Sequence, residues 1–221
     1  MKLPWLDPEG PPSQLPSAEH ALDDPAGLVA AGGALTPDWL CHAYSQGIFP
    51  WYSPQQPILW WSPDPRCVIV PAQFKRHRSL LKAARNRGYS VKRNTDFAAV
   101  IDGCAAPRGE DTGTWITPAM RRAYQVLHEQ GLAHSVEVWA DNTLVGGLYG
   151  VQRGGVFFGE SMFSRVADAS KIALLDLVQG CAQAGIELID CQFPTDHLTR
   201  LGATTLSRAE FLARVRRLAG P

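Results

Sequence analysis

The sequence predicts an α+β protein with a smaller N-terminal α+β domain and a larger, sheet-forming C-terminal domain. Residues 133–164 read as three consecutive strands, because apolar runs there are separated by two turn-forming pairs. A helix-length apolar run and one further strand-like run follow, whereas the first third of the chain has a single short helical pattern. With 221 residues, of which 45% are hydrophobic, the chain can bury a substantial core. We place the domains at residues 1–100 and 101–221.

Charge and cysteine content narrow the class of protein. Lysine plus arginine and aspartate plus glutamate number 21 each, so no net field draws the molecule towards nucleic acid or an anionic membrane. The sequence has no apolar signal segment at its start and no apolar run of about 18 residues. Its five cysteines lack C-x-x-C spacing, which disfavours a disulfide framework and a zinc site. We therefore expect a cytoplasmic protein with free thiols.

The N-terminal domain is expected to contain one short helix beside an aromatic cluster. Residues 1–25 are rich in proline and acids and predict an irregular arm. Thr36 suits a helix N-cap, Pro37 the first helical position and Gly47 the position after the C-cap. The aromatic residues that follow form either core packing or a rigid aromatic wall: Trp51, Tyr52, Trp60 and Trp61.

A basic segment lies near the end of this domain. Residues 67–94 contain no acid and carry eight of the 21 basic residues. Pro71 can open a helix there and Gly88 can close it. At helical spacing, four basic side chains form one stripe, which is either a solvated face or a phosphate-binding surface: Lys75, Arg78, Lys82 and Arg85.

The elements of the C-terminal domain are bounded by turn and cap residues. Asp141 and Gly154 begin the two tight turns of a three-stranded meander. Residues 170–185 predict a buried helix that ends at a glycine, and residues 186–193 predict a further strand. Ser207 begins the last helix with a capping-box pattern.

Three polar residues on apolar strands are candidate site residues. Period-two alternation places Asp190 and Gln192 on one face of their strand. The same rule groups Glu160 with Phe158 and Met162. Buried polar groups cost free energy unless they are paired, so these side chains either satisfy one another or face a ligand cavity. A cavity with an apolar body and a few such polar anchors suits an apolar amino acid.

Several kinds of chemistry are not indicated. No Ser or Cys stands in a nucleophile-elbow context, no H-E-x-x-H or Cys/His cluster suggests a metal, and no P-loop or G-x-G-x-x-G is present. A meander, a helix and a further strand resemble the acyl-CoA N-acyltransferase (GNAT-like) architecture. The stretch before the helix, SRVADASK, lacks the glycines of a pyrophosphate loop, so coenzyme A is not expected.

Taken together, ten motifs make the sequence resemble one family, the leucyl/phenylalanyl-tRNA-protein transferases. They run in order across residues 27–203. The motifs are GLVAAGGALTP, AYSQGIFPWY, ILWWSPDPR, GTWIT, HSVEVW, LVGGLYGV, FGESMFS, ASKIALL, LIDCQ and HLTRLGA.

The resemblance implies a reaction and its partners. Leu or Phe, and Met less well, would pass from aminoacyl-tRNA to the N-terminal amine of proteins beginning with Arg or Lys, which marks them for degradation by the N-end rule pathway. No metal or cofactor is implied, and no membrane partner.

The resemblance also implies residue roles. Phe157, Met162, Leu148 and Ile189 would line the amino-acid pocket, and Trp51 and Trp115 would lie near the adenosine at the 3′ end of the tRNA. Glu160, Asp190 and Gln192 match the family's polar catalytic residues. The basic stripe of Lys75, Arg78, Lys82 and Arg85 matches a cluster that binds the tRNA backbone. The basic helix thus belongs to the N-terminal domain, and the catalytic residues belong to the GNAT-like domain.

The chemistry needs little from the protein, because the aminoacyl ester is already activated and the attacking group is an amine. Asp190 is the better candidate for orienting the α-amine or accepting its proton, since an amide such as that of Gln192 does not titrate near neutrality. A proton relay through Gln192 and pure substrate orientation both stay open. Glu160 or Asp190 could also attract the cationic acceptor residue.

Three positions depart from the family pattern. Ala34 replaces an acid, Arg200 replaces a small polar residue, and Leu148 replaces a Met that often lines the pocket. The last of these could change the preference between Leu and Phe.

Three alternative functions stay open beside this one. They are a peptidoglycan-bridge type of aminoacyl-tRNA-dependent transferase, a non-catalytic RNA-binding module and a small-molecule N-acetyltransferase.

Overall fold

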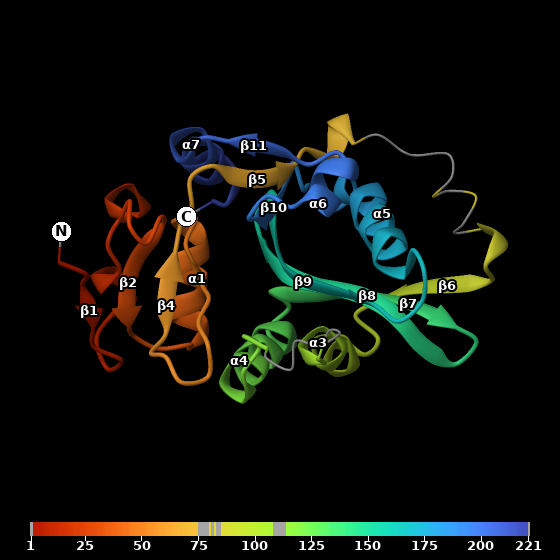
Figure 1. Cartoon of the computed structure of the whole chain (residues 1–221), viewed down its shortest axis with the longest axis horizontal. Helices are drawn as coiled ribbons and strands as arrows, with labels where there is room; N and C mark the ends of the chain where they lie inside the picture. Colours follow the sequence, from red (N-terminus) through yellow and green to blue (C-terminus); the bar gives the residue numbers. More distant parts are fainter. Residues whose placement is uncertain (1, 75–79, 81, 83–84, 108–113, 221) are drawn as a thin grey trace.

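The computed structural model describes residues 2–74, 80, 82, 85–107 and 114–220, and it contains two sheets (Figure 1). The smaller sheet has the order β1-β2-β4-β3. Strand β1 pairs with β2 in parallel, and the other neighbours are antiparallel. The strands are β1 (Trp5–Leu6), β2 (Leu28–Gly32), β3 (Phe49–Pro50) and β4 (Leu59–Trp61).

The larger sheet has the order β11-β5-β10-β9-β8-β7-β6. Strands β9 and β10 are parallel, and helix α5 (Ala169–Cys181) connects them. This meander, helix and strand confirm the predicted α+β class and the order of its elements. The strands are β5 (Arg66–Ile69), β6 (Tyr89–Arg93), β7 (Ala133–Ala140), β8 (Thr143–Arg153), β9 (Val156–Ser164), β10 (Leu188–Gln192) and β11 (Thr204–Leu206).

Helices cover both faces of the larger sheet. In Figure 1, α5 lies on one face, and α3 (Phe97–Ala105) and α4 (Pro118–Glu129) lie on the other. One apolar layer fills the space beneath α5. The second layer is shared by the α3/α4 side of the large sheet, the smaller sheet, α1 (Pro37–Ser45) and α7 (Arg208–Leu218). Other short helices are α6 (Asp196–Arg200) and the 3₁₀ turns Pro12–Gln14, Ala18–His20 and Pro71–Gln73.

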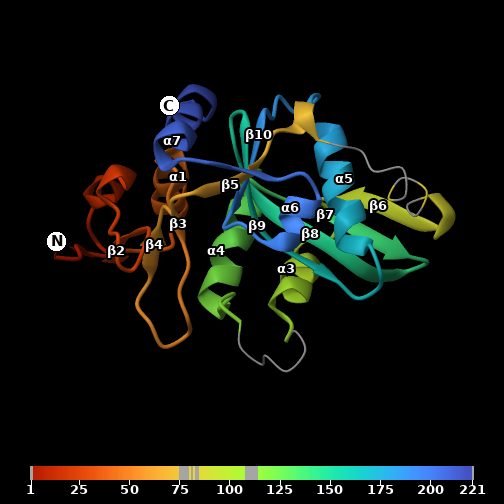
Figure 2. The ribbon, with the colours of Figure 1, turned by 45° about the horizontal axis from the view of Figure 1, so that its top comes forward.

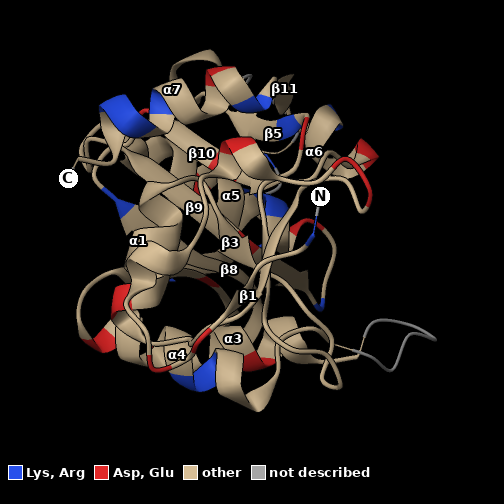
Figure 3. Ribbon diagram, turned by 90° about the vertical axis from the view of Figure 1, so that its left-hand side faces the viewer, with Lys and Arg blue, Asp and Glu red and all other residues tan. Residues whose placement is uncertain are grey.

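Helix α1, from the N-terminal third of the chain, packs against the C-terminal helix α7. Helices α1 and α7 lie next to each other in Figures 1 and 2. Gly47, which follows α1 with a φ of 69°, packs so closely that a Cβ would come within 2.6 Å of Leu212 Cδ2. Glycine is therefore required there both for the backbone conformation and for space. Figure 3 shows Lys and Arg distributed over several elements, including α4 and α7.

Most of the predicted boundaries are confirmed. The Thr36 side chain accepts from the Trp39 N–H at the start of α1, and Ser207 and Glu210 form the capping box of α7. Both meander turns lie where expected, at Asp141 and Gly154. Helix α5 ends at Cys181, before the predicted end, because the following residues form a turn that leads to Gly185.

The prediction that the basic helix starts at Pro71 is wrong. Pro71 opens only a 3₁₀ turn, and Phe74 then adopts an extended backbone because its side chain turns into the apolar layer beneath α5. Lys75 and Arg78 lie outside the described residues. Lys82 and Arg85 are exposed and have helical backbone.

The N-terminal arm is irregular as predicted, except that β1 joins the smaller sheet.

Sheet membership bears on the domain division. Strands β5 and β6 precede residue 100, yet β5 pairs with β10 and β6 pairs with β7 in the larger sheet. The division at residue 100 stays a prediction, and the strand pairing favours an earlier boundary, between β4 and β5.

Candidate active site

Two β-bulges lie on the neighbouring strands β9 and β10. The pairing of β8 with β9 passes from Tyr149↔Ser161 to Gly150↔Gly159, which leaves Glu160 as the extra residue. The pairing of β10 with β5 shifts between Asp190 and Gln192. Bulges turn side chains away from strict alternation and are common beside active sites. Both polar segments that the sequence singled out are therefore redirected by the backbone.

Because of the bulge at Glu160, the predicted assignment of β9 side chains to the two faces of the sheet is wrong. Val156 and Phe158 belong to the layer shared with the smaller sheet, whereas Phe157 lies beneath α5. Met162 also packs beneath α5, although alternation grouped it with Phe158 and Glu160. The extra residue shifts the phase by one position, so Phe157 and Met162 share a face.

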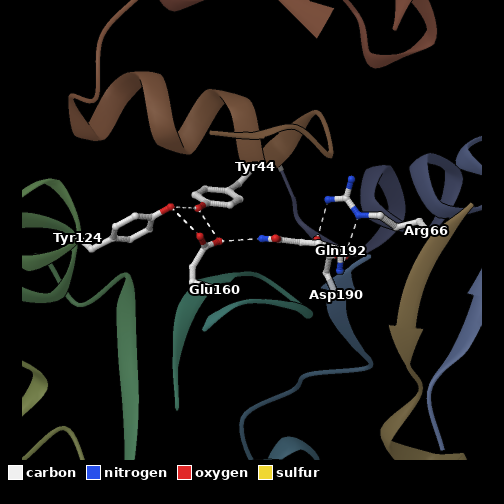
Figure 4. A network of polar contacts seen from close by, with 6 residues as sticks. All are labelled: Tyr44, Arg66, Tyr124, Glu160, Asp190 and Gln192. Atoms are coloured by element: carbon white, nitrogen blue, oxygen red, sulfur yellow. Dashed lines mark hydrogen bonds and ion pairs between the residues drawn. The ribbon is translucent and has the colours of Figure 1, made fainter. Parts of the chain in front are cut away.

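Glu160 is held by two tyrosines from different segments. The Tyr44 hydroxyl of α1 donates to its Oε1 at 2.7 Å, and the Tyr124 hydroxyl of α4 donates to its Oε2 at 2.8 Å (Figure 4). The two phenol oxygens are also 2.6 Å apart. Two phenols supply only two protons for these three contacts, so the third contact is satisfied when the carboxyl carries a proton.

The surroundings of Glu160 agree with that proton count. Burial raises its pKa to about 7, against the opposing effect of hydrogen bonds from the two tyrosines. The pKa of Tyr44 and of Tyr124 is also raised, mainly by burial and next by the nearby Glu160 charge. Glu160 therefore changes its protonation state close to neutral pH.

Asp190 is fully engaged by the protein. Arg66 Nε donates to its Oδ1 at 2.8 Å and Arg66 Nη2 to its Oδ2 at 2.7 Å, with both side chains fully buried. The backbone N–H of Gln192 also donates to Oδ1, at 2.9 Å. Since both oxygens accept from Arg66, the geometry favours a positioning role for Asp190 over that of a proton acceptor.

Gln192 links the two carboxyl groups. Its φ is 62°, in the left-handed region that few residues other than glycine adopt. From this conformation its Nε2 donates to Glu160 Oε1 at 3.3 Å (Figure 4). Glu160, Asp190 and Gln192, which the sequence predicted together, therefore form one connected network.

An apolar cavity of about 340 Å³ lies beside this network. The four residues predicted for an amino-acid pocket all line it, namely Leu148, Phe157, Met162 and Ile189. Leu174 and Leu177 of α5 close its apolar part, and α6 contributes His197 and Leu198. Glu160, Asp190 and Gln192 line the same cavity and provide its polar groups.

A larger cavity of about 700 Å³ adjoins the first at Trp115, which lines both. Trp51 lines this larger cavity with 41% of its surface exposed. Its ring lies edge-on to Trp61 at 5.7 Å and tilted to Phe193 at 5.6 Å. The predicted aromatic wall is present, whereas Trp60 is a buried core residue stacked on Trp39.

Sequence reasoning missed three members of the network: Arg66, Tyr44 and Tyr124. A signal existed for Arg66, because a charged residue followed directly by the apolar run CVIV predicts a buried, paired charge. The two tyrosines had no comparable signal.

In the described part of the chain, no group of three or more His, Cys, Asp or Glu side chains could hold a metal ion, and no helix is long and apolar enough to cross a membrane.

The sequence matches a known family over most of its length. Residues 68–216 match the family model for leucyl/phenylalanyl-tRNA protein transferase, and residues 33–64 match the model of that family's N-terminal domain. Curated relatives carry the same family name. The one from Chromohalobacter salexigens is 57% identical and covers 95% of this chain and 81% of its own. Those from Azoarcus sp. and Pseudomonas putida are 55% and 56% identical, with 97% and 95% of this chain and 90% and 92% of their own covered.

Solved structures are similar at low sequence identity. FemX is 12% identical with a TM-score of 0.48, over 72% of this chain and 61% of its own. A GCN5-related N-acetyltransferase from Kribbella flavida is 12% identical with a TM-score of 0.42, over 77% and 61%.

Proposed function

Because the chain belongs to the leucyl/phenylalanyl-tRNA protein transferase family and is thus an aminoacyltransferase, we propose that it transfers Leu or Phe, and Met less well. The donor is the aminoacyl-tRNA, and the acceptor is the N-terminal amine of proteins that begin with Arg or Lys. The product carries an N-end rule degradation signal, and the reaction takes place in the cytoplasm. The enzyme uses no cofactor.

The observation that carries this proposal is the pair of adjoining cavities. The amino-acid side chain occupies the smaller cavity between Leu148, Phe157, Met162 and Ile189. The terminal adenosine occupies the larger cavity, where Trp51 and Trp115 offer aromatic faces for a base. The ester then lies between the two cavities, near Trp115, Glu160 and Gln192.

The reaction forms one C–N bond and breaks the ester C–O bond to the ribose. The α-amine nitrogen attacks the ester carbonyl carbon, and the ribose oxygen leaves with a proton. Gln192 orients the incoming amine through its amide oxygen, since its Nε2 is directed to Glu160. Holding amine and ester in contact supplies much of the rate acceleration for an ester that is already activated.

The acceptor residue is proposed to enter beside Glu160. Asp190 is paired with Arg66, so its charge is compensated within the protein. Glu160 titrates at about pH 7 and provides a carboxylate for a cationic acceptor once it is ionised. This assigns the attraction of Arg or Lys to Glu160 rather than to Asp190.

The tRNA body is proposed to contact the basic stripe Lys75, Arg78, Lys82 and Arg85. Lys75 and Arg78 lie outside the described residues, and the exposed Lys82 and Arg85 support the assignment. Such contacts with phosphates release counterions, so binding weakens as salt rises.

The deciding experiment measures transfer of labelled Phe from Phe-tRNA to three versions of one model protein, which begin with Arg, Lys or Ala. We expect label on the Arg and Lys versions alone. Label on the Ala version would contradict the acceptor rule. No label on any version, with tRNA still bound, would support a non-catalytic RNA-binding protein instead. Thermal stabilisation by acetyl-CoA would support an N-acetyltransferase.

A further inference from the structure

Arg66 lies where three parts of the chain meet. It begins β5, and its guanidinium is paired with Asp190 of β10 through two hydrogen bonds. The guanidinium carbon is 4.7 Å from the centre of the Phe49 ring and 4.4 Å from the centre of the Phe211 ring. Phe49 comes from the smaller sheet and Phe211 from the C-terminal helix. Arg66 is thus fixed by two hydrogen bonds and by two aromatic rings.

Stability alone does not account for this arrangement. Both side chains are completely buried, and removing two charges from water costs free energy that their attraction often fails to recover. Nη1 of Arg66 is buried and has no hydrogen-bond partner among the described residues, which adds to that cost. Two apolar side chains of similar volume would fill the same space at lower cost.

The ion pair is linked to the backbone of Gln192 through one carboxylate oxygen. Asp190 Oδ1 accepts both from Arg66 Nε and from the Gln192 backbone N–H. The second bond holds Gln192 at its left-handed φ of 62°, a conformation that costs on the order of 1 kcal/mol or more for a residue with a side chain. From there the Gln192 side chain reaches Glu160 and lines the apolar cavity. Figure 4 shows this path from Arg66 through Asp190 and Gln192 to Glu160.

We propose that Arg66 is a positioning residue for aminoacyl transfer, acting through Asp190 to hold Gln192 in the conformation that orients the acceptor amine. Arg66 does not need to contact either substrate. Its guanidinium fork keeps the carboxylate rotated so that Oδ1 faces the Gln192 N–H. Phe49 and Phe211 hold the fork in plane, so the smaller sheet and the C-terminal helix both support the site.

This inference rests on the proposed transferase function, and one assay separates the two. Initial rates of Phe transfer from Phe-tRNA to a protein beginning with Arg are measured for the wild type, Arg66→Met, Arg66→Lys and Asp190→Asn. Arg66→Met should lower kcat by about 100-fold, as expected when reacting groups are misplaced by about 1 Å. The KM for Phe-tRNA should stay within about threefold, because Arg66 lines neither cavity and the apolar walls of both are unchanged.

The double variant Arg66→Met/Asp190→Asn tests whether the two residues act as a unit. Its kcat should be no lower than that of Arg66→Met alone, since both changes disrupt the same two-pronged pairing that turns Oδ1 towards the Gln192 N–H. Arg66→Lys keeps the charge but loses the two-pronged geometry, so it should recover only part of the activity. Losses that multiply in the double variant would contradict the proposal.

Arg93→Met is the matched control. It breaks a second Arg–Asp pair, in which Nε lies 2.7 Å from Asp176, away from the network. Its kcat should equal that of the wild type. Wild-type kcat in folded Arg66→Met, or a raised KM at unchanged kcat, would overturn the inference. If Arg66→Met does not fold, Arg66→Lys decides: reduced kcat at unchanged KM supports the proposal, and wild-type kcat contradicts it. Absence of transfer by the wild type would instead refute the proposed function.

Discussion

At the scale of single residues, Glu160 should make the stability of the fold depend on pH. Its pKa is raised from 4.5 to about 7 in the folded protein, so the folded state favours the protonated carboxyl. This favourable contribution is complete below about pH 4.5 and is lost as pH rises through 7, which amounts to about 2 to 3 kcal/mol between pH 5 and 8. Glu160→Gln is neutral at every pH and avoids that loss.

Urea unfolding of the wild type and Glu160→Gln at pH 5 and pH 8 measures this effect. The difference in unfolding free energy should shift by about 2 to 3 kcal/mol in favour of Glu160→Gln at the higher pH. Glu9→Gln, at an exposed position in the N-terminal arm, is the control and should show no such shift. An equal difference at both pH values would contradict a Glu160 pKa near neutrality.

Leu148 is the residue whose size should decide between Leu and Phe. It is buried in the wall of the small cavity. Leu148→Val removes one methylene, so a Leu substrate loses contact while a Phe substrate gains room. The ratio of kcat/KM for Phe-tRNA over Leu-tRNA should rise by about tenfold, the usual effect of one methylene in an apolar pocket. Leu148→Phe narrows the cavity and should change the ratio in the opposite direction; a common direction for both variants would exclude Leu148 as the determinant.

At the scale of elements, caps and turns could be predicted because their signals are local. Thr36, Ser207, Asp141 and Gly154 each specify their own backbone, and all four lie where expected. The bulge at Glu160 could not be predicted, because it is set by the register of the pairing with β8 and not by a local residue pattern. The same limit applies to Tyr44 and Tyr124, whose partner lies more than 30 residues away along the chain.

The exposed basic segment should contribute to tRNA binding without contributing to chemistry. The double variant Lys82→Ala/Arg85→Ala removes two contacts with phosphates, so KM for Phe-tRNA should rise at unchanged kcat. The slope of log KM against log salt should fall by about 1.4 to 1.8, the value for two lost phosphate contacts. Phe-adenosine, a donor without a tRNA body, should react at the wild-type rate.

Arg216→Ala/Arg217→Ala on α7 is the control for that experiment. It removes the same charge from two exposed positions of another helix. Its salt slope should match that of the wild type. If the control and the double variant lose the same slope, the effect reflects total charge and not a binding site on residues 82–85.

At the scale of the whole molecule, both sheets should unfold as one unit. A single apolar layer includes Trp60 and Val29 of the smaller sheet, Tyr149 of the larger sheet and Phe211 of α7. Neither sheet can lose its packing without exposing the other's, so we expect one transition in calorimetry that coincides with loss of near-UV circular dichroism. The Arg66 contacts with Phe49 and Phe211 tie catalytic competence to that same layer.

Trp60→Phe tests this cooperativity from the smaller sheet. Trp60 is fully buried, and its Nε1 donates to the Gly32 carbonyl at 2.8 Å, so the variant leaves a small void and an unpaired acceptor. A loss of about 2 to 3 kcal/mol is expected for those two effects, which lowers Tm by about 5 to 10 °C for a chain of this size. Trp5→Ala, at a residue that is 73% exposed, should change Tm little. If the sheets are cooperative, Trp60→Phe lowers Tm and the temperature at which transferase activity disappears by the same amount. A separate early transition that leaves activity intact would show instead that the smaller sheet unfolds independently of the active site.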